Sequence, residues 1–318
     1  GAIHEDEKFG PDYFLPTDAY LETCAAVGAV FFSQRMNQLT CNARYMDEVE
    51  RVLYNNVLTG VSLSGDKYTY QNPLNTDKPD RWEWHVCPCC PPMFLKIMAA
   101  MPGYIYAYQG DNVYVNLFIG SEVRVPVGKS NSVRLKQLTS YPWHGAVSIQ
   151  VNPDKASTFS MKVRIPGWAQ GTENPYDLYQ SNLKAPVKLK VNQEDVLLRI
   201  VDGYAEINRE WKKGDHIELE LPMQPRLITA NKAVENLRGQ VALASGPIIY
   251  CFEDADNPEL QTFKLQAQTP LELSHDSNLL NGVNIIKCQG DIPAKAIPYY
   301  AVANREESHS YKVWIPQK

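Results

Sequence analysis

The sequence predicts an α+β multidomain protein with a helical part up to residue 103 and a strand-rich part after it. In the first part apolar residues recur at spacings of three and four, whereas after Tyr104 they alternate with polar residues. Helices and strands that are segregated along a chain favour separate domains. The boundary is expected near Pro102-Gly103, because these two residue types end helices.

Three helices are expected in the first part, at residues 19–36, 43–58 and 93–101. Thr17 or Asp18 can cap the first helix, Gly60 stops the second, and Pro91-Pro92 opens the third. Three helices cannot enclose a core by themselves. This part is therefore expected to pack against a further stretch of polypeptide that is absent from this chain.

The rest of the chain has the period-two pattern of strands that bury one face. Alternating apolar residues cover residues 113–119, 161–165, 187–191 and 217–221. Gly110-Asp111-Asn112 and Lys213-Gly214-Asp215 supply hairpin turns before two of these runs. The sequence predicts one antiparallel β-sandwich domain over residues 104–226 and a second over residues 227–296, with the strands of residues 297–318 returning to the first.

Composition excludes several classes of function. The 318 residues are 44% hydrophobic, which allows a sizeable core, and the net charge is -5. The sequence contains no stretch rich in lysine and arginine that could bind a row of phosphates, so nucleic acid is not an expected partner. No apolar run approaches the roughly 20 residues that span a bilayer, so no membrane contact is expected. The first residues lack the pattern of a signal peptide, and no other feature marks a compartment.

The cysteines are few and unevenly placed. Of the seven, Cys87, Cys89 and Cys90 fall within four residues. Adjacent cysteines such as Cys89 and Cys90 rarely form a disulfide with each other, because the geometry is strained. The cluster is therefore interpreted as a set of metal-binding or catalytic thiols.

A carboxylate and another thiol complete a candidate zinc site. Glu22 and Cys24 lie two residues apart at the start of the first expected helix, and Cys89 and Cys90 could supply two more ligands. Three thiolates and one carboxylate suit Zn²⁺, which binds four ligands tetrahedrally and favours sulfur. The spacing alone leaves open a purely structural zinc knuckle, with Cys24 as a core residue. The surrounding prolines favour a rigid loop at a helix N-terminus, where the dipole stabilises a thiolate.

Four segments carry a family resemblance in the order Glu22-Thr23-Cys24-Ala25-Ala26, Glu50-Arg51-Val52-Leu53-Tyr54-Asn55, Tyr70-Gln71-Asn72-Pro73-Leu74 and Cys87-Pro88-Cys89-Cys90-Pro91-Pro92. With them the chain resembles glycoside hydrolase family 127, the β-L-arabinofuranosidases, and the related family 146. Strand segments such as Arg164-Ile165-Pro166-Gly167-Trp168-Ala169 extend the resemblance over nearly the whole chain. It implies that residues 1–103 are the C-terminal part of an (α/α)6 barrel, followed by two antiparallel β-sandwich domains. A missing segment or another chain would supply the N-terminal half of the barrel.

The same resemblance implies a zinc ion with the ligands Glu22, Cys24, Cys89 and Cys90. Cys89 would also be the nucleophile of a retaining glycosidase, attacking the anomeric carbon to form a thioglycosyl intermediate. The acid/base would be Glu7, which lies 15 residues before Glu22 and just ahead of an aromatic residue, with Glu5 and Asp6 as rivals.

Tyr70 and Glu50 would contact the sugar. Without the resemblance, a tyrosine in such a segment is more often a packing residue, and a helical glutamate is more often solvated or paired with Arg51. The implied partner is an oligosaccharide or glycopeptide of plant type that ends in β-L-arabinofuranose.

Two other classes of function remain open from the residues. One is a non-catalytic carbohydrate-binding or structural module with a zinc staple, in which Trp143, Trp168 or Trp211 could stack on sugars, although tryptophan in a sandwich is more often core. The other is a cysteine peptidase, which needs a histidine near its thiol, and only His85 is close in sequence. An acid/base at Glu7 favours the glycosidase, because a structural module has no use for it.

Overall fold

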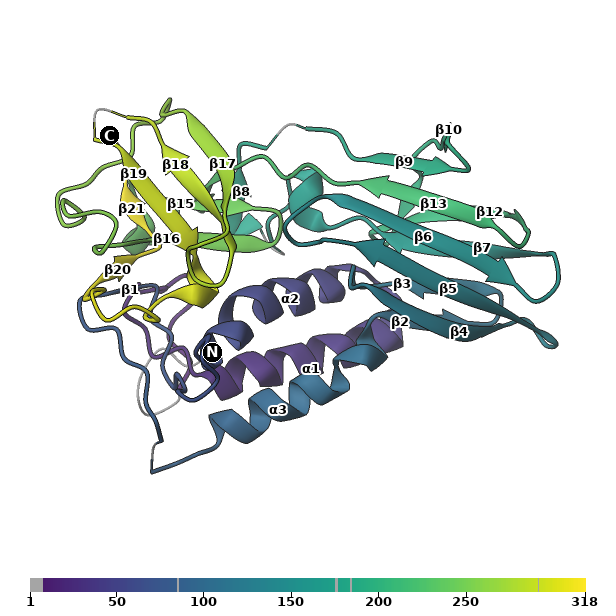
Figure 1. Ribbon diagram of the computed structural model, residues 1–318, viewed down its shortest axis with the longest axis horizontal. Coiled ribbons are helices and arrows are strands. Elements are labelled where there is room, and N and C mark those ends of the chain that lie inside the picture. The colour runs from purple at the N-terminus through teal and green to yellow at the C-terminus, as the bar shows by residue number, and fades with distance from the viewer. Residues whose placement is uncertain (1–7, 85, 175–176, 184, 291) are drawn as a thin grey trace.

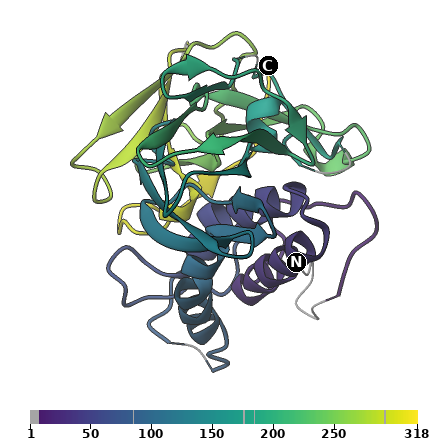
Figure 2. The same cartoon turned by 90° about the vertical axis from the view of Figure 1, so that its right-hand side faces the viewer.

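The helices lie along one side of two β-regions that stand next to each other (Figures 1 and 2). A computed structural model describes residues 8–84, 86–174, 177–183, 185–290 and 292–318. The predicted order of helices first and strands afterwards is confirmed. None of the helices in the described part of the chain has the length and apolar character that crossing a bilayer requires.

Three α-helices form the helical region: α1 (Thr23–Thr40), α2 (Arg44–Val52) and α3 (Cys90–Ala100). A π-helical turn (Leu53–Val57) and a 3-10 turn (Leu58–Gly60) prolong α2 to the predicted stop. The start predicted for the first helix is wrong by four residues. Leu21 has a positive φ of 38°, and Glu22 is extended and bridges to Gln71, so the segment before Thr23 runs beside another strand-like segment.

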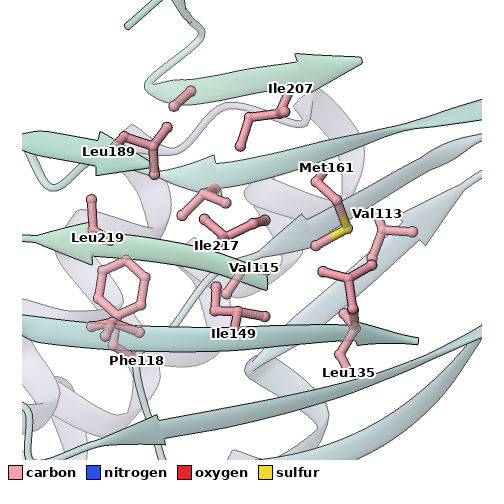
Figure 3. Close-up of a cluster of buried hydrophobic side chains, with 14 of the residues drawn as sticks. Val113, Val115, Phe118, Leu135, Ile149, Met161, Leu189, Ile207, Ile217 and Leu219 are labelled. Atoms are coloured by element: carbon pink, nitrogen blue, oxygen red, sulfur yellow. The ribbon is translucent and has the colours of Figure 1, made fainter. Parts of the chain in front are cut away.

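Two sheets enclose the core of the middle region. The six-stranded sheet runs in the order β10 (Glu194–Asp195), β9 (Lys188–Val191), β13 (Asp215–Glu220), β6 (Ala146–Pro153), β5 (Asn131–Thr139) and β4 (Ser121–Val127). The five-stranded sheet runs in the order β11 (Ile200–Val201), β12 (Tyr204–Trp211), β7 (Ser157–Arg164), β3 (Asn112–Val115) and β2 (Tyr106–Gln109). Their inner faces share one cluster of buried side chains, among them Ile149, Met161 and Ile217 (Figure 3).

A hairpin turn that was predicted from the sequence forms in this region. Gly110 and Asp111 join β2 and β3 as an antiparallel hairpin, as predicted. Burial alternates along β6, as its period-two pattern requires. One pairing differs from the expected antiparallel sheets, because β3 lies parallel to β7. One edge of β3 pairs with β2 in the hairpin, and its other edge pairs with β7. Because a long stretch of chain connects β3 to β7, these two strands can run in the same direction.

The last part of the chain forms a ten-stranded sheet. Its main path is β17 (Leu271–Asp276), β18 (Val283–Cys288), β19 (Ala294–Pro298), β16 (Ile248–Glu253), β15 (Gln240–Ser245), β14 (Arg226–Ala230) and β8 (Tyr179–Ser181). Off this path lie β1 (Asn75–Thr76), β20 (Tyr311–Lys312) and β21 (Ile315–Pro316). Buried clusters pack on this sheet, and several of its strands are buried at almost every position.

The prediction that residues 297–318 return to the first β-domain is wrong, because their strands pair within the ten-stranded sheet. β21 pairs with the start of β15, and β20 pairs with the end of β16. The start of β15 and the end of β16 reach past the strands that pair with the rest of β15 and β16. Their backbone N–H and C=O groups need other partners there, and β21 and β20 supply them. β1 pairs with β20 in turn, so the helical region also contributes a strand to this sheet.

Candidate metal centre

The N-termini of α1 and α3 meet at the predicted cluster. Glu22 is the residue before α1, with extended backbone, and Cys24 lies in the first turn. Cys89 is the residue before α3, and Cys90 is its first residue, followed by Pro91. Proline suits this position because the first backbone N–H groups of a helix have no partner within it. Two helix starts thus bring residues 65 positions and more apart in sequence to one place.

The four predicted ligands form one group. One ligand atom from each of Glu22, Cys24, Cys89 and Cys90 lies within 4.8 Å of all the others. The Sγ atoms of Cys24 and Cys90 are 3.4 Å apart, and the Sγ of Cys89 is 3.5 Å from Oε1 of Glu22. Glu22 and Cys90 are buried, while Cys24 and Cys89 are half-buried. Cys87 is exposed and lies outside the group.

The surroundings of Cys24 and Cys90 raise the pKa of both thiols. Burial, followed by hydrogen bonds with Cys89 and Cys90, raises the pKa of the Cys24 thiol well above its ordinary value. Burial raises the pKa of the Cys90 thiol to about 12. All seven cysteines are free thiols. Three thiols and a carboxylate at this separation are a donor set for a metal ion, and their sulfur content suits a borderline-soft cation.

Tyr70 stands beside the cluster. Its hydroxyl is 3.8 Å from the Sγ of Cys89. The segment that carries it is fixed against the start of α1, because the N–H of Thr23 donates to the Tyr70 carbonyl at 3.0 Å. The hydrogen bond with the Tyr20 side chain, then burial, raises the pKa of Tyr70 above its ordinary value. The structure therefore brings this predicted sugar contact to the candidate nucleophile.

Two further aromatic rings, those of Tyr20 and Trp82, lie next to Tyr70. The sequence alone did not identify them as neighbours of the site. Tyr20 meets Tyr70 edge-on at 5.9 Å between ring centroids, and Trp82 stacks on it at 6.1 Å. Trp82 belongs to a stretch, residues 68–84, in which aromatic residues are frequent, whereas Tyr20 lies outside it. Without coordinates, nothing in that stretch tells which rings face the cluster.

Glu50 is not brought to the cluster. It is 1% exposed, and its carboxylate contacts residues of the middle region. Oε1 accepts a hydrogen bond from Tyr141 at 2.8 Å and pairs with Arg164, while Oε2 accepts from Trp168 at 3.3 Å and from Arg164 at 3.3 Å. With both oxygens engaged by protein donors, the predicted sugar contact finds no support in its surroundings. Its partner is also Arg164, not the sequence neighbour Arg51.

The candidate acid/base Glu7 and its rivals Glu5 and Asp6 lie outside the described residues, as does His85.

Models of one enzyme family match the chain along almost its whole length. Residues 1–103 match the family 127 β-L-arabinofuranosidase catalytic domain, residues 112–223 its middle domain and residues 225–316 the family 127 C-terminal domain. The chain belongs to glycoside hydrolase family 127. The predicted resemblance is thereby confirmed.

Relatives in family 127 carry names of one activity. A non-reducing end β-L-arabinofuranosidase of Bifidobacterium longum subsp. longum is 31% identical over 96% of this chain. Among solved structures, the family 127 β-arabinofuranosidase BT3674 superposes with a TM-score of 0.93 at 36% identity, covering 100% of the chain. A β-L-arabinofuranosidase from Geobacillus stearothermophilus T6 gives 0.91 at 35% identity, again over 100%. The chain spans about half of each, namely 51% of the curated relative and 53% of both solved chains.

Proposed function

We propose that this protein is a retaining glycoside hydrolase that releases terminal β-L-arabinofuranosyl residues from plant-type glycans or glycopeptides. The observation that carries the proposal is the group of three thiols and one carboxylate within 4.8 Å, in a chain of family 127. The names of the relatives, at 31 to 36% identity, support the sugar. A purely structural staple is the competing candidate, and the half-buried position of Cys89 argues against it, because staple thiols gain nothing from access to a ligand.

Zinc is the proposed ion, and Glu22, Cys24, Cys89 and Cys90 would hold it. The donor chemistry fits, since three sulfurs and a carboxylate can complete a tetrahedral site. A bound zinc ion would supply positive charge that keeps the sulfur of its ligands in the thiolate form.

The chain's own groups then perform a double displacement. The Sγ of Cys89 attacks the anomeric carbon, and the bond from that carbon to the leaving oxygen breaks as the carboxyl group of Glu7 donates its proton to that oxygen. The Glu7 carboxylate next takes a proton from water, whose oxygen attacks the same carbon, and the carbon–sulfur electron pair returns to Cys89. Two inversions give net retention. Tyr70, 3.8 Å from this sulfur, is placed to hold the sugar against it.

The domain organisation belongs to the same proposal. Residues 1–103 would form the C-terminal part of an (α/α)6 barrel, completed by an N-terminal half from a preceding segment or another chain. α1, α2 and α3 would be its last helices. Residues 104–226 and the residues from 227 onward would be two β-sandwich domains, and the ends of the three matched family models, at 103, 223 and 316, support these divisions.

Metal content and turnover together test the proposed function. The full-length protein is expected to contain one zinc per chain by elemental analysis and to hydrolyse p-nitrophenyl β-L-arabinofuranoside. Removal of the metal with a chelator is expected to abolish turnover, because the cysteine sulfurs lose the positive charge that keeps them in the thiolate form. Addition of zinc is expected to restore turnover. Stoichiometric zinc without turnover of this substrate would assign the cluster to a structural staple.

The acid/base assignment is tested in the same assay. Glu7→Gln is expected to lower kcat by about a hundredfold, within the range that general acid–base catalysis contributes. Glu5→Gln and Asp6→Asn serve as matched controls, with kcat expected to stay within about twofold, since neither carboxylate would touch the leaving oxygen. Azide should restore turnover to Glu7→Gln by replacing water in the second step. A larger loss in either control variant would move the acid/base to that residue.

A further inference from the structure

Among Trp143, Trp168 and Trp211, the tryptophans considered above for stacking on a sugar, Trp143 lines a cleft. Trp168 and Trp211 are 6% and 0% exposed and belong to the core of the middle region. Trp143 is half-buried and lines a cleft of about 730 Å³. One wall comes from the turn before β6 and the end of β13, and the other from β17 and β18. The lining thus comes from both β-regions, whose arrangement Figure 1 shows.

One hydrogen bond joins the two walls of the cleft, and a second, within one wall, orients the side chain that makes it. Nδ1 of His275 on β17 lies 3.0 Å from Oδ1 of Asn284 on β18, whose Nδ2 donates to the carbonyl of Trp143 at 3.0 Å. Because Nδ2 is the donor of this amide, Oδ1 must accept, so His275 carries its proton on Nδ1. The turn that carries Trp143 is thus tied to the opposite wall.

Gly145 and Leu221, which both line the cleft, pack closely against each other. The N–H of Leu221 donates to the carbonyl of Gly145 at 3.0 Å. A side chain at Gly145 would place its Cβ 1.9 Å from the Leu221 carbonyl oxygen, so only glycine permits this approach. This part of the lining is therefore held in a fixed position, as the lining of ligand sites in proteins usually is.

The lining combines an aromatic and apolar surface with a few polar groups. On β17, the hydroxyl of Ser274 is closed to solvent and therefore does not reach a ligand in the cleft. Lys188 and Glu220 line the opposite wall with exposed side chains of opposite charge, so the cleft favours neither anions nor cations.

We infer that this cleft binds a neutral oligosaccharide chain as a second carbohydrate site, separate from the thiol cluster. Sugar rings present C–H faces that pack on an aromatic ring and hydroxyls that both donate and accept hydrogen bonds. These features match Trp143 together with the exposed side chains of Lys188 and Glu220. The site goes beyond the proposed hydrolysis, since it would hold a part of the glycan away from the scissile sugar.

Affinity electrophoresis of the full-length protein through gels that contain soluble arabinogalactan tests this site. The polysaccharide is expected to retard the protein, and Trp143→Ala to weaken the apparent binding constant about tenfold, as truncation of a central tryptophan does. Tyr108→Ala removes a ring that is 56% exposed on β2, outside the cleft, and is expected to leave retardation unchanged. Hydrolysis of p-nitrophenyl β-L-arabinofuranoside should be unaffected by either substitution.

A second variant keeps the test decisive if Trp143→Ala does not fold. Ala146 lines the cleft from an exposed position at the start of β6, so Ala146→Trp fills the space without disturbing the core. It is expected to weaken retardation about tenfold as well. Equal retardation of wild type and Ala146→Trp, or no retardation of the wild type, would overturn the inference. Because Cys89→Ser should be retarded normally, failure of the proposed hydrolysis is distinguishable from failure of this site.

Discussion

Replacing Cys89 by serine is expected to lower kcat/KM for p-nitrophenyl β-L-arabinofuranoside by at least about 10³-fold, because the step that forms the bond to the anomeric carbon loses its nucleophile. The choice of Cys89 over its neighbour follows from accessibility. Cys90 is 1% exposed, whereas Cys89 is half-buried and lies 3.8 Å from the Tyr70 hydroxyl. Of the adjacent pair, only Cys89 is open to an incoming sugar. Steady-state kinetics with the full-length protein measures the effect.

Cys87→Ser is the matched control for this prediction. Cys87 is an exposed thiol two residues away that lies outside the ligand group, so its loss should leave kcat/KM within about twofold. Mass spectrometry of wild type trapped with a slow substrate should locate the adduct on the peptide that contains Cys89. Zinc content has to be measured for both variants. If Cys89→Ser bound zinc and turned over normally, the nucleophile would have to be sought elsewhere.

Local chemistry explains which parts of the fold could be predicted from the sequence. The β2–β3 hairpin follows from Gly110 and Asp111, since these residue types set a tight turn by their own backbone preferences. Burial along β6 follows from alternation within one strand. The ligand group was predicted from residue types and the order of the motifs, and the structure brings Glu22 together with the three cysteines.

Long-range partners explain what could not be predicted. The start of α1 is decided by the bridge between Glu22 and Gln71, a contact across 49 positions that no local pattern reports. The pairing of β20 and β21 depends on which strand ends were left without partners, and that is settled only after the other strands have assembled. Glu50 was interpreted as a sugar contact from the family resemblance, and its pairing with Arg164, 114 residues away, could not be inferred from the sequence.

Breaking the pair between Glu50 and Arg164 is expected to be the most destabilising substitution outside the ligand group. Arg164 is 0% exposed, and Glu50 is 1% exposed. The carboxylates of Glu50 and Asp47 overcome the effect of burial and raise the pKa of Arg164 above its ordinary value. Arg164→Met would leave the buried Glu50 carboxylate without its cation, which costs about 3–5 kcal/mol. Urea unfolding followed by tryptophan fluorescence measures this loss, since Trp168 donates to the same carboxylate.

The surface pair of Arg124 and Asp154 provides the matched control. Their side chains are 62% and 47% exposed, so solvent screens the charges and Arg124→Met should change the unfolding midpoint little. The double variant with Glu50→Gln and Arg164→Met should lose less than the sum of the single losses, because no unpaired charge remains buried. Equal destabilisation by Arg124→Met and Arg164→Met would refute this account.

The same variants decide between a structural and a sugar-binding Glu50. Each oxygen of its carboxylate already accepts hydrogen bonds from protein donors, Tyr141 and Arg164 on one and Trp168 and Arg164 on the other. Glu50→Gln should therefore lower stability and the yield of folded protein, while the folded fraction keeps its KM. A KM raised tenfold or more in protein that is fully folded would instead place this carboxylate on the substrate. The geometry around Arg164 favours the first result, because a sugar hydroxyl would have to displace a donor of a buried ion pair.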